Sequence, residues 1–385
     1  MRGIYLDHAA TAPVRPEVVA AMEPYAADRF GNPSSVHRWG QQARAALEEA
    51  RERLAAAVGA ARREIVFTGS GTEADNLAVL GRWLHARRVG GPAAVACSAV
   101  EHKAVLAAVR AAAREGADAL ILAVDEEGRT DLGAVEEALR SRPCVLSVMW
   151  GNNETGVLQP VEEIAGLCRE AGVVFHSDAV QALGRVPVRV DRVPCDLLTV
   201  SAHKIGGPKG IGALYVRSGV DLEPLLHGGG QEAGLRPGTQ NVAAAVGFAT
   251  AAELAVQEQA AEAERLAALR DRLEKALVEG LPGTVVNGGG APRLPHIVNV
   301  SVPGVDQESV LFVLDLEGVA ASSGSACTSG AVELSHVLAA MGRTADERTA
   351  SVRLSLGRTT TAAEVDEAAR IIVDALARMR AAAES

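Results

Sequence analysis

Residues 63 to 217 alternate short runs of apolar, β-branched residues with longer amphipathic segments that are rich in alanine. This alternation is typical of βαβ units, in which a helix returns the chain to a parallel neighbouring strand. The runs are almost continuously apolar, so helices are expected to cover both faces of the sheet. The pattern predicts a large α/β domain whose strands lie in seven runs: 64–68, 93–98, 117–124, 144–150, 173–177, 196–201 and 212–217.

A different pattern follows this region. The stretch from Asn241 to Glu279, rich in Ala, Glu, Leu and Arg, predicts one long helix that connects to a new unit. Beyond it, strand-like runs such as HIVNVSV and VRLSL mix with helical patterns, which predicts a smaller α+β domain. We expect residues 16–254 to form the large domain, and residues 1–15 and 255–385 to form the small domain, with a mobile loop at about 318–332.

The composition excludes several classes of protein. The 385 residues carry a net charge of −10 and only 3% are aromatic, which disfavours direct binding to nucleic acid. The five cysteines form no CxxC pair and the chain has no HExxH motif, so neither a disulfide scaffold nor a metal site is expected. No apolar run of about 18 residues occurs, and we expect a cytoplasmic protein that does not enter a membrane.

Lysine is nearly absent from the chain. Only four of the 38 basic residues are lysine, and two of these, Lys204 and Lys209, lie in the short segment HKIGGPKG. Ser201, His203 and Lys204 directly follow an apolar run. A lysine amine forms Schiff bases with carbonyl cofactors, which a guanidinium group cannot do. Codon bias explains the general shortage of lysine, but its retention here favours amine chemistry at Lys204 over chance placement.

The segment FTGSGTEADNLAVL, residues 67–80, predicts a strand, a glycine-rich turn and a helix that starts at or near Thr72. Exposed backbone N–H groups around Gly71 and the helix dipole would suit a phosphate group. The segment also fits a loose GxGxxA dinucleotide motif. On this segment alone, a capped helix after a tight turn is an equally good interpretation.

Further polar side chains are predicted at the same edge of the sheet. Asp178 and Gln181 come just past an apolar strand, where open α/β sheets bind ligands. Asp178 either caps the next helix or pairs with a cationic ring nitrogen. His102 also follows an apolar strand, and it either reaches this edge or simply begins the next helix.

Cys327 differs from the other four cysteines because it lies in a run of small, flexible residues, GVAASSGSACTSGA. The others occur in apolar contexts or beside Pro194 and are interpreted as packed thiols. A thiol on a Gly/Ser-rich loop is exposed and able to move, which makes Cys327 a candidate nucleophile.

Considered together, these segments resemble a pyridoxal-phosphate enzyme of the aminotransferase fold (fold type I, class V), and specifically a cysteine desulfurase of the NifS/IscS type. The resemblance runs nearly from end to end and rests on motifs that occur in order: YLDHAATAP, FGNPSSVHRWG, GTEADN, EHKAV, NNETG, HSDAVQALG, SAHKIGGPKGIGALYVR, GGGQEAGLRPGT, SSGSACTSG and VRLSLGR. It implies a large domain with a mostly parallel seven-stranded sheet between helices, and a small α+β domain.

The resemblance also implies roles for individual residues. Lys204 would hold pyridoxal 5'-phosphate as a Schiff base and move protons at the substrate α-carbon. Asp178 would pair with the ring nitrogen, Gln181 would bind the ring hydroxyl, and His102 would stack on the ring and assist proton transfer. The phosphate would be bound by Gly71, Thr72, Ser201 and His203, and by Thr239 from the partner subunit of a homodimer.

The implied substrate is L-cysteine, whose carboxylate Asn153 and Arg353 would hold, the latter through bidentate hydrogen bonds. The Cys327 thiolate would take the substrate sulfur as a persulfide and leave L-alanine. A sulfur-acceptor protein would then receive this sulfur for iron–sulfur cluster assembly or for thio-modification of tRNA, a cofactor or DNA. Cys327 would have to move from the cofactor to this acceptor, and a Gly/Ser-rich loop would allow that movement.

Two alternatives stay open. A selenocysteine lyase of the same fold would release selenium without Cys327, and a non-catalytic homologue would keep the fold only to bind a partner. Gly71 and Gly206 stand where many relatives have alanine and tyrosine, and the tail to Ser385 lacks the longer extension with which some relatives dock an iron–sulfur scaffold. The acceptor is therefore not identified.

Overall fold

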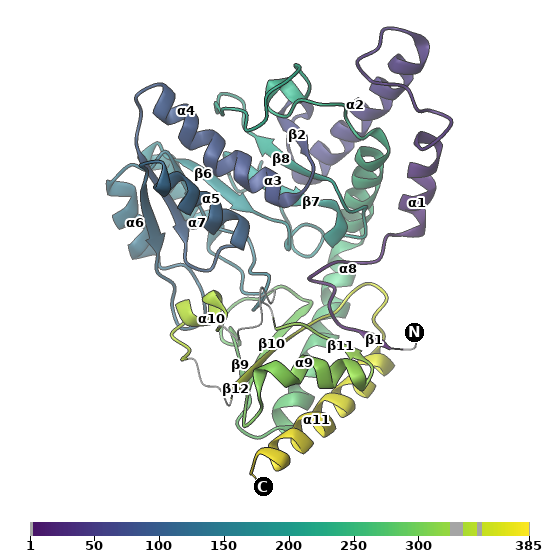
Figure 1. Ribbon diagram of the computed structural model, residues 1–385, viewed down its shortest axis with the longest axis vertical. Helices are drawn as coiled ribbons and strands as arrows, with labels where there is room; N and C mark the ends of the chain where they lie inside the picture. The colour runs from purple at the N-terminus through teal and green to yellow at the C-terminus, as the bar shows by residue number, and fades with distance from the viewer. Residues whose placement is uncertain (1–2, 324–333, 345–348, 385) are drawn as a thin grey trace.

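The computed structural model describes residues 3–323, 334–344 and 349–384, in which one long helix runs from an upper part to a lower part (Figure 1). The upper part is built on a seven-stranded sheet, and each of its strands lies in one of the predicted runs except that β6 extends one residue past its run, to Asp178. In spatial order the strands are β2 (Ile65–Thr68), β8 (Gly212–Val216), β7 (Leu197–Ser201), β6 (Val174–Asp178), β5 (Val145–Ser147), β3 (Ala94–Ser98) and β4 (Asp118–Leu122).

The sheet is mostly parallel, as the sequence predicts. The five strands from β7 to β4 are parallel to their neighbours, whereas β8 pairs antiparallel with both β7 and β2. All the parallel strands therefore end at one edge of the sheet, and the loops that follow them meet there. The expected α/β fold class is confirmed.

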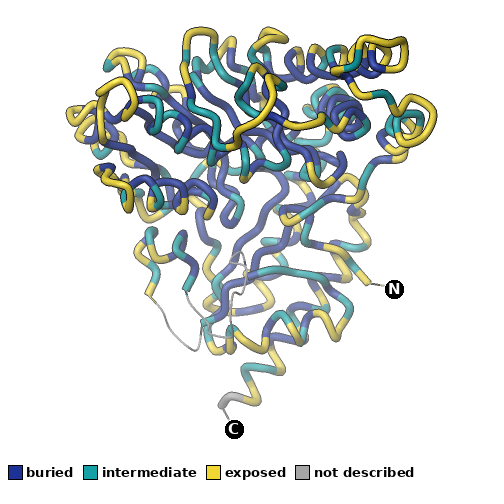
Figure 2. The backbone as a smooth tube through the Cα atoms, turned by 45° about the horizontal axis from the view of Figure 1, so that its top comes forward, coloured by how far each residue is buried: buried dark blue, intermediate teal, exposed yellow. Residues whose placement is uncertain are grey.

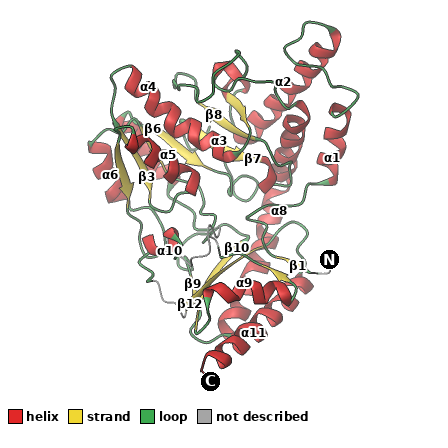
Figure 3. Cartoon of the chain, in the orientation of Figure 1, coloured by secondary structure: helices red, strands yellow, loops and turns green. Residues whose placement is uncertain are grey.

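Helices cover both faces of this sheet, as Figure 3 shows. Alternate residues of each strand point to opposite faces, so Ile65 and Phe67 pack into one cluster and Val66 into another. The first cluster includes residues of α1 (Pro16–Met22), α2 (Arg38–Val58), α6 (Leu132–Arg140), α7 (Val161–Ala171) and α8 (Val242–Gly280). The other face is covered by α3 (Gly71–Asn76), a π-helical turn (Leu77–Gly81), α4 (Arg82–Arg88) and α5 (Lys103–Arg114).

The lower part contains two small sheets. The first is antiparallel, in the order β12 (Thr349–Ser355), β10 (Ile297–Pro303) and β9 (Val285–Val286), and the second pairs β1 (Ile4–Tyr5) with β11 (Val319–Ala320) in parallel. Two helices, α9 (Gln307–Leu316) and α11 (Ala362–Glu384), pack with them, and a short helix, α10 (His336–Ala340), lies closer to the large sheet (Figure 1). Short 3-10 turns complete the chain at Glu23–Tyr25, Arg62–Glu64, Ala202–Lys204 and Glu232–Gly234.

Helix α8 joins the two parts and follows the predicted helix from Asn241 to Glu279 within one residue. Its residues up to Ala255 belong to the large core, and its residues from Leu266 onward belong to the small one. Figure 2 shows a buried backbone in both parts. We therefore propose the domain division expected from the sequence, with the boundary inside α8 close to residue 254. None of the described helices is long and apolar enough to cross a membrane.

A buried ion pair fixes residues 228–240, which we call the strap, to the large sheet. Two nitrogens of Arg51 donate to the two carboxylate oxygens of Glu232 at 2.6 and 2.8 Å, and the backbone N–H of Phe67 donates to the same carboxylate at 2.8 Å. Both side chains are buried. Glu232 and Ala233 have φ angles of 48° and 56°, a left-handed conformation that non-glycine residues adopt only when the surrounding contacts hold them there.

We predict that Glu232→Ala destabilises the protein by about 3–5 kcal/mol, because it leaves the Arg51 charge buried without a partner. Urea unfolding measures the change. The matched control is Glu253→Ala, which removes the partly exposed ion pair between Arg53 and Glu253 and is expected to cost less than about 1 kcal/mol. Equal losses in the two variants would contradict this role of Glu232.

Candidate active site

A cavity of about 370 Å³ lies where the loops after the parallel strands meet residues of the lower part. Such a volume is within the usual range of small-molecule sites. A second cavity, beside Arg15 and Glu258, holds only about 50 Å³ and is too small for a coenzyme. The predicted site residues that line the large cavity are Gly71, Thr72, His102, Asn153, Asp178, Gln181, Ser201, His203, Lys204 and Arg353.

One end of the cavity is suited to a phosphate group. Helix α3 begins at Gly71, one residue before the expected start, and the Ser70 hydroxyl caps it by accepting from the Glu73 N–H at 3.1 Å. A side chain at Gly71 would place its Cβ 3.0 Å from a methyl group of Val180, a tight approach that the glycine avoids. The Ser201 hydroxyl is buried nearby without a hydrogen-bond partner among the described residues. An anion at this point would satisfy it.

Lys204 follows β7 on a 3-10 turn, and its Nζ donates to the carbonyl oxygens of Ala9 and Ala10 at 2.5 and 2.9 Å. Burial, with a further contribution from the positive charge of Arg353, lowers the pKa of Lys204 to about 8. An amine with such a pKa is partly neutral near pH 7, and the neutral amine is the form that attacks a carbonyl group.

Asp178 and Gln181 line the same cavity as this lysine. Asp178 is the last residue of β6, and its Oδ1 accepts the backbone N–H of Val180 at 2.9 Å. Burial raises the pKa of Asp178, whereas the nearby His102, the hydrogen bond from the Val180 N–H and the positive charge of Lys204 oppose that change. The Nε2 of Gln181 donates to the Ala9 carbonyl at 2.8 Å, the same oxygen that accepts from Lys204.

Two histidines of the site, His102 and His203, are neutral near pH 7. Burial lowers the pKa of His102, and its Nδ1 caps α5 by accepting from the Ala104 N–H at 3.2 Å. Burial also lowers the pKa of His203 to about 4, with help from the charge of Lys204. His203 contacts the hydroxyl of Thr11 at 3.2 Å. Neutral rings at these positions add no positive charge beside Lys204.

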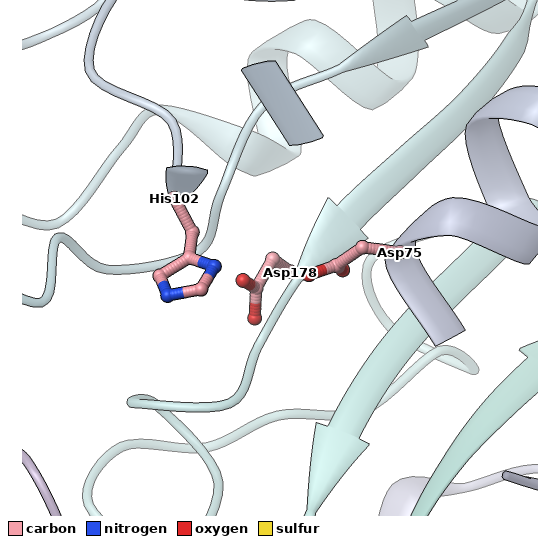
Figure 4. A group of neighbouring side chains, drawn as sticks. All are labelled: Asp75, His102 and Asp178. Atoms are coloured by element: carbon pink, nitrogen blue, oxygen red, sulfur yellow. The ribbon is translucent and has the colours of Figure 1, made fainter. Parts of the chain in front are cut away.

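A second carboxyl group, Asp75 on α3, lies beside Asp178 and was not predicted from the sequence. Figure 4 shows Asp75, His102 and Asp178 directed toward one another, and their ligand atoms all lie within 4.8 Å of one another. Burial and the charge of Asp178 raise the pKa of Asp75 well above its usual value. Two carboxyl groups this close in a buried site do not both ionise readily, so we interpret Asp75 as the neutral member of the pair.

A buried chain of hydrogen bonds supports this pair from beneath. His176 contacts the hydroxyl of Ser147 at 2.8 Å through Nδ1 and that of Thr199 at 3.0 Å through Nε2, and the same Nε2 lies 3.7 Å from Oδ1 of Asp75. Burial lowers the pKa of His176 to about 3, so the ring is neutral. The chain continues from Ser147 to the buried carboxyl group of Glu101 at 3.4 Å.

Two of the predicted residues do not line the cavity of the described chain. Thr239 is exposed on the strap, and Cys327 lies outside the described residues. The described residues that flank the gap at 324–333 do reach the cavity, since Ser322 and His336 both line it. His336 was missed by the sequence interpretation, and its Nε2 lies 2.9 Å from the carbonyl oxygen of Glu101. Nothing in its local sequence, a short helix start, distinguishes it from a surface histidine.

The cavity residues fit pyridoxal phosphate. The Lys204 amine can join a carbonyl group, the Asp178 carboxylate can accept a ring N–H⁺, and the unpartnered Ser201 hydroxyl lies beside a helix start suited to phosphate.

Comparisons with known proteins point to the same chemistry. The family profile Aminotransferase class-V matches residues 4–368. The protein named Cysteine desulfurase IscS from Anaeromyxobacter sp. (strain Fw109-5) is 47% identical over 380 residues, which cover 98% of this chain and 93% of that protein. A solved structure described as a NifS-like protein has a TM-score of 0.90 at 33% identity and covers 98% of this chain and 100% of its own. Another, described as SspA in complex with cysteine, has a TM-score of 0.80 at 35% identity and covers 91% of this chain and 98% of its own.

We predict that Asp75→Asn changes the pH dependence of stability in the cofactor-free protein. The pKa of Asp75 is raised on folding, so the stability that it contributes is complete below its unfolded pKa of about 4 and is lost as pH rises toward the folded pKa. Relative to the variant, the wild type is expected to lose about 1.4 kcal/mol per pH unit above pH 4 or so. Urea unfolding at a series of pH values upward from about 4 measures the slope.

The control for this prediction is Asp191→Asn. The Arg189 guanidinium lowers the pKa of the exposed Asp191, so its contribution has the opposite sign and is lost as pH falls. A wild type and an Asp75→Asn variant with parallel pH profiles would mean that Asp75 is ionised in the folded protein.

Proposed function

The chain belongs to the class-V aminotransferase family of pyridoxal-phosphate-dependent enzymes, and we propose that this cysteine desulfurase transfers the sulfur of L-cysteine to Cys327 as a persulfide. The proposal rests chiefly on one observation. A single cavity collects an amine at Lys204, a carboxylate at Asp178 and a guanidinium at Arg353, three groups that this reaction needs at different atoms of cofactor and substrate.

Bound pyridoxal phosphate supplies an aldehyde that condenses with amines and a cationic ring that accepts electrons when a bond at the substrate α-carbon breaks. We assign its phosphate to Gly71, Thr72, Ser201 and His203, and its ring nitrogen to Asp178. Asp178 is suited to this position because it is the member of the carboxyl pair for which the positive charge of Lys204 opposes the rise in pKa. Gln181 would bind the ring hydroxyl, and His102 would lie against the ring face.

Lys204 is the residue that we assign to proton transfer at the substrate α-carbon. Its pKa of about 8 leaves a useful neutral fraction near pH 7, and an amine of that pKa both accepts and returns a proton at that pH. His102 is neutral and lines the same cavity, so its ring nitrogens are available to assist. At the other end, Arg353 and Asn153 would bind the α-carboxylate of the substrate.

Cys327 is assigned as the sulfur acceptor because the other four cysteines are unsuitable. All four are buried, and burial raises the pKa of each of their thiols, to about 11 at Cys144 and about 12 at Cys168. In the proposed step the Cys327 thiolate forms an S–S bond to the substrate sulfur while the C–S bond breaks. The electron pair and one proton pass to the substrate carbon, so L-cysteine and the enzyme thiol give L-alanine and the enzyme persulfide.

The proposed function involves two protein partners, a second copy of the chain and a sulfur acceptor. We propose a homodimer in which Thr239 completes the phosphate site of the other subunit, because Thr239 is exposed and does not line the cavity of its own chain. The persulfide would be passed to an acceptor protein for iron–sulfur cluster assembly or for thio-modification of tRNA, a cofactor or DNA. The free thiols suit the reducing cytoplasm.

Lys204→Ala is predicted to abolish the visible absorption band of the purified protein, because a methyl group cannot form an imine with the cofactor aldehyde. Lys209→Ala is the matched control, since Lys209 is exposed in the same loop and lies outside the cavity. Absorption spectra of the two variants after incubation with the cofactor measure the effect. An unchanged band in Lys204→Ala would refute the assignment.

Cys327→Ser is predicted to lower the release of alanine from L-cysteine by about 100-fold or more in the absence of added thiol, because a hydroxyl group is a far weaker acceptor for sulfur than a thiolate. Cys195→Ser is the control, because Cys195 is a buried thiol far less able to ionise. Alanine is quantified after a single incubation. Turnover at the parental rate in Cys327→Ser would exclude the persulfide step.

The same variants distinguish the alternative functions. A selenocysteine lyase would keep its activity on selenocysteine after Cys327→Ser, while a non-catalytic homologue would release no alanine in either background. Transfer of labelled sulfur from L-cysteine to a purified scaffold or thiolation enzyme would identify the acceptor.

A further inference from the structure

Arg353 is held at two of its three guanidinium nitrogens. Its Nη1 donates to the carbonyl oxygen of Asn153 at 2.9 Å, and its Nη2 donates to Oδ1 of Asp7 at 2.8 Å. The side chain is 5% exposed and lines the cavity. Its Nε–H is buried and has no hydrogen-bond partner among the described residues. The guanidinium is therefore fixed in place by two of its nitrogens, while its Nε–H is left unused by the described residues.

Asp7 is itself rigidly placed next to the strand that carries Arg353. It forms a bridge to Ser355 on β12, and on either side of it the Leu6 carbonyl accepts from Ser355 N–H at 2.7 Å and the His8 N–H donates to the Ser355 carbonyl at 3.2 Å. The hydroxyl of Tyr5 also donates to the Asp7 carbonyl at 3.0 Å. Residues 353 and 355 of a strand share one face, so the Asp7 carboxylate is held on the Arg353 side.

Burying a guanidinium group without a counter-ion costs free energy. A counter-ion that bonded to all the N–H donors of the guanidinium would, however, leave none of them for a substrate. Asp7 contacts only one nitrogen of Arg353. It thus compensates the charge and fixes the plane of the group without occupying the Nε edge. This arrangement leaves donors in the fork geometry with which arginine binds a carboxylate.

We propose that Asp7 is a positioning residue that aims Arg353 at the α-carboxylate of the substrate, so that the preference for amino acids over simple amines depends on Asp7. The inference rests on the proposed function, in which Arg353 binds that carboxylate. A competing carboxylate would act in the opposite direction, because its removal would free Arg353 and tighten the binding of substrate.

The binding test uses two small amines that differ only in the carboxylate, L-alanine and ethylamine. Each is titrated into the cofactor-loaded protein, and its dissociation constant is read from the change in the visible band. Asp7→Ala is expected to weaken binding of L-alanine by about 10-fold or more while ethylamine binding stays within about twofold. Asp7→Asn, which keeps an oxygen acceptor but loses the charge, is expected to lie between Asp7→Ala and the wild type.

Kinetics give a second readout. For L-cysteine, Asp7→Ala is expected to raise KM by about 10-fold or more with a much smaller change in kcat, because an interaction with the carboxylate is present in both ground and transition states. The control is Asp366→Asn, which removes the charge of an exposed aspartate paired with Arg272 and is expected to leave both constants unchanged. In an Arg353→Ala background, Asp7→Ala is expected to add no further loss, since the residue it positions is absent.

The outcomes separate the inference from the function on which it rests. Equal weakening of L-alanine and ethylamine in the Asp7 variants, or tighter binding of L-alanine, overturns the positioning role. If instead Arg353→Ala leaves L-alanine binding unchanged, the carboxylate assignment of the proposed function fails as well. If Asp7→Ala does not fold, the two amines are compared in Asp7→Asn instead. Weaker binding of L-alanine with unchanged binding of ethylamine then supports the positioning role, and unchanged binding of L-alanine contradicts it.

Discussion

The active site depends on the path of residues 7–11, which link the small sheets to the end of the large one. Asp7 is fastened beside β12 and binds Arg353, and two residues later the Ala9 carbonyl accepts hydrogen bonds from both Lys204 and Gln181. Residues far apart in sequence thus take their positions from one short segment. Because its backbone is hydrogen-bonded on both sides, the distance between the amine end and the carboxylate end of the cavity is fixed.

Burial limits the number of charges around the cavity. A charge that lacks a partner in a buried site is expensive, so the groups without one are neutral. This applies to His102, His176 and His203, whose pKa values are lowered, and to Asp75 and Glu101, whose pKa values are raised. Lys204, Asp178 and the Asp7–Arg353 pair keep charges that the chemistry uses. The neutral side chains hold these charged groups in place without adding further charges beside them.

The sequence predicted the strands and the polar residues that directly follow them in the cavity for a physical reason. Parallel strands are buried on both faces and end at one edge, so a polar residue directly after an apolar run, such as Asp178 or Lys204, is conspicuous. Asp75 was missed because it lies inside a helix, where an aspartate usually faces solvent. His336 reaches the cavity, and Asp7 reaches Arg353, only through tertiary packing. The rare lysine was informative because 34 of the 38 basic residues are arginine, which supplies charge but not amine chemistry.

The phosphate turn and the strap are coupled through one carboxylate, that of Glu73. Its Oε2 accepts the backbone N–H of Gly69 at 2.8 Å, within the turn, and its Oε1 accepts from Arg236 on the strap at 2.9 Å. The buried pair of Arg51 and Glu232 fixes the same strap at a second point. In the proposed homodimer, Thr239 would extend from this doubly held segment into the other subunit. A shift of the turn or of the strap would then alter the phosphate site of its own subunit and, through Thr239, that of the partner subunit. Binding of the cofactor and association of the subunits would therefore stabilise each other.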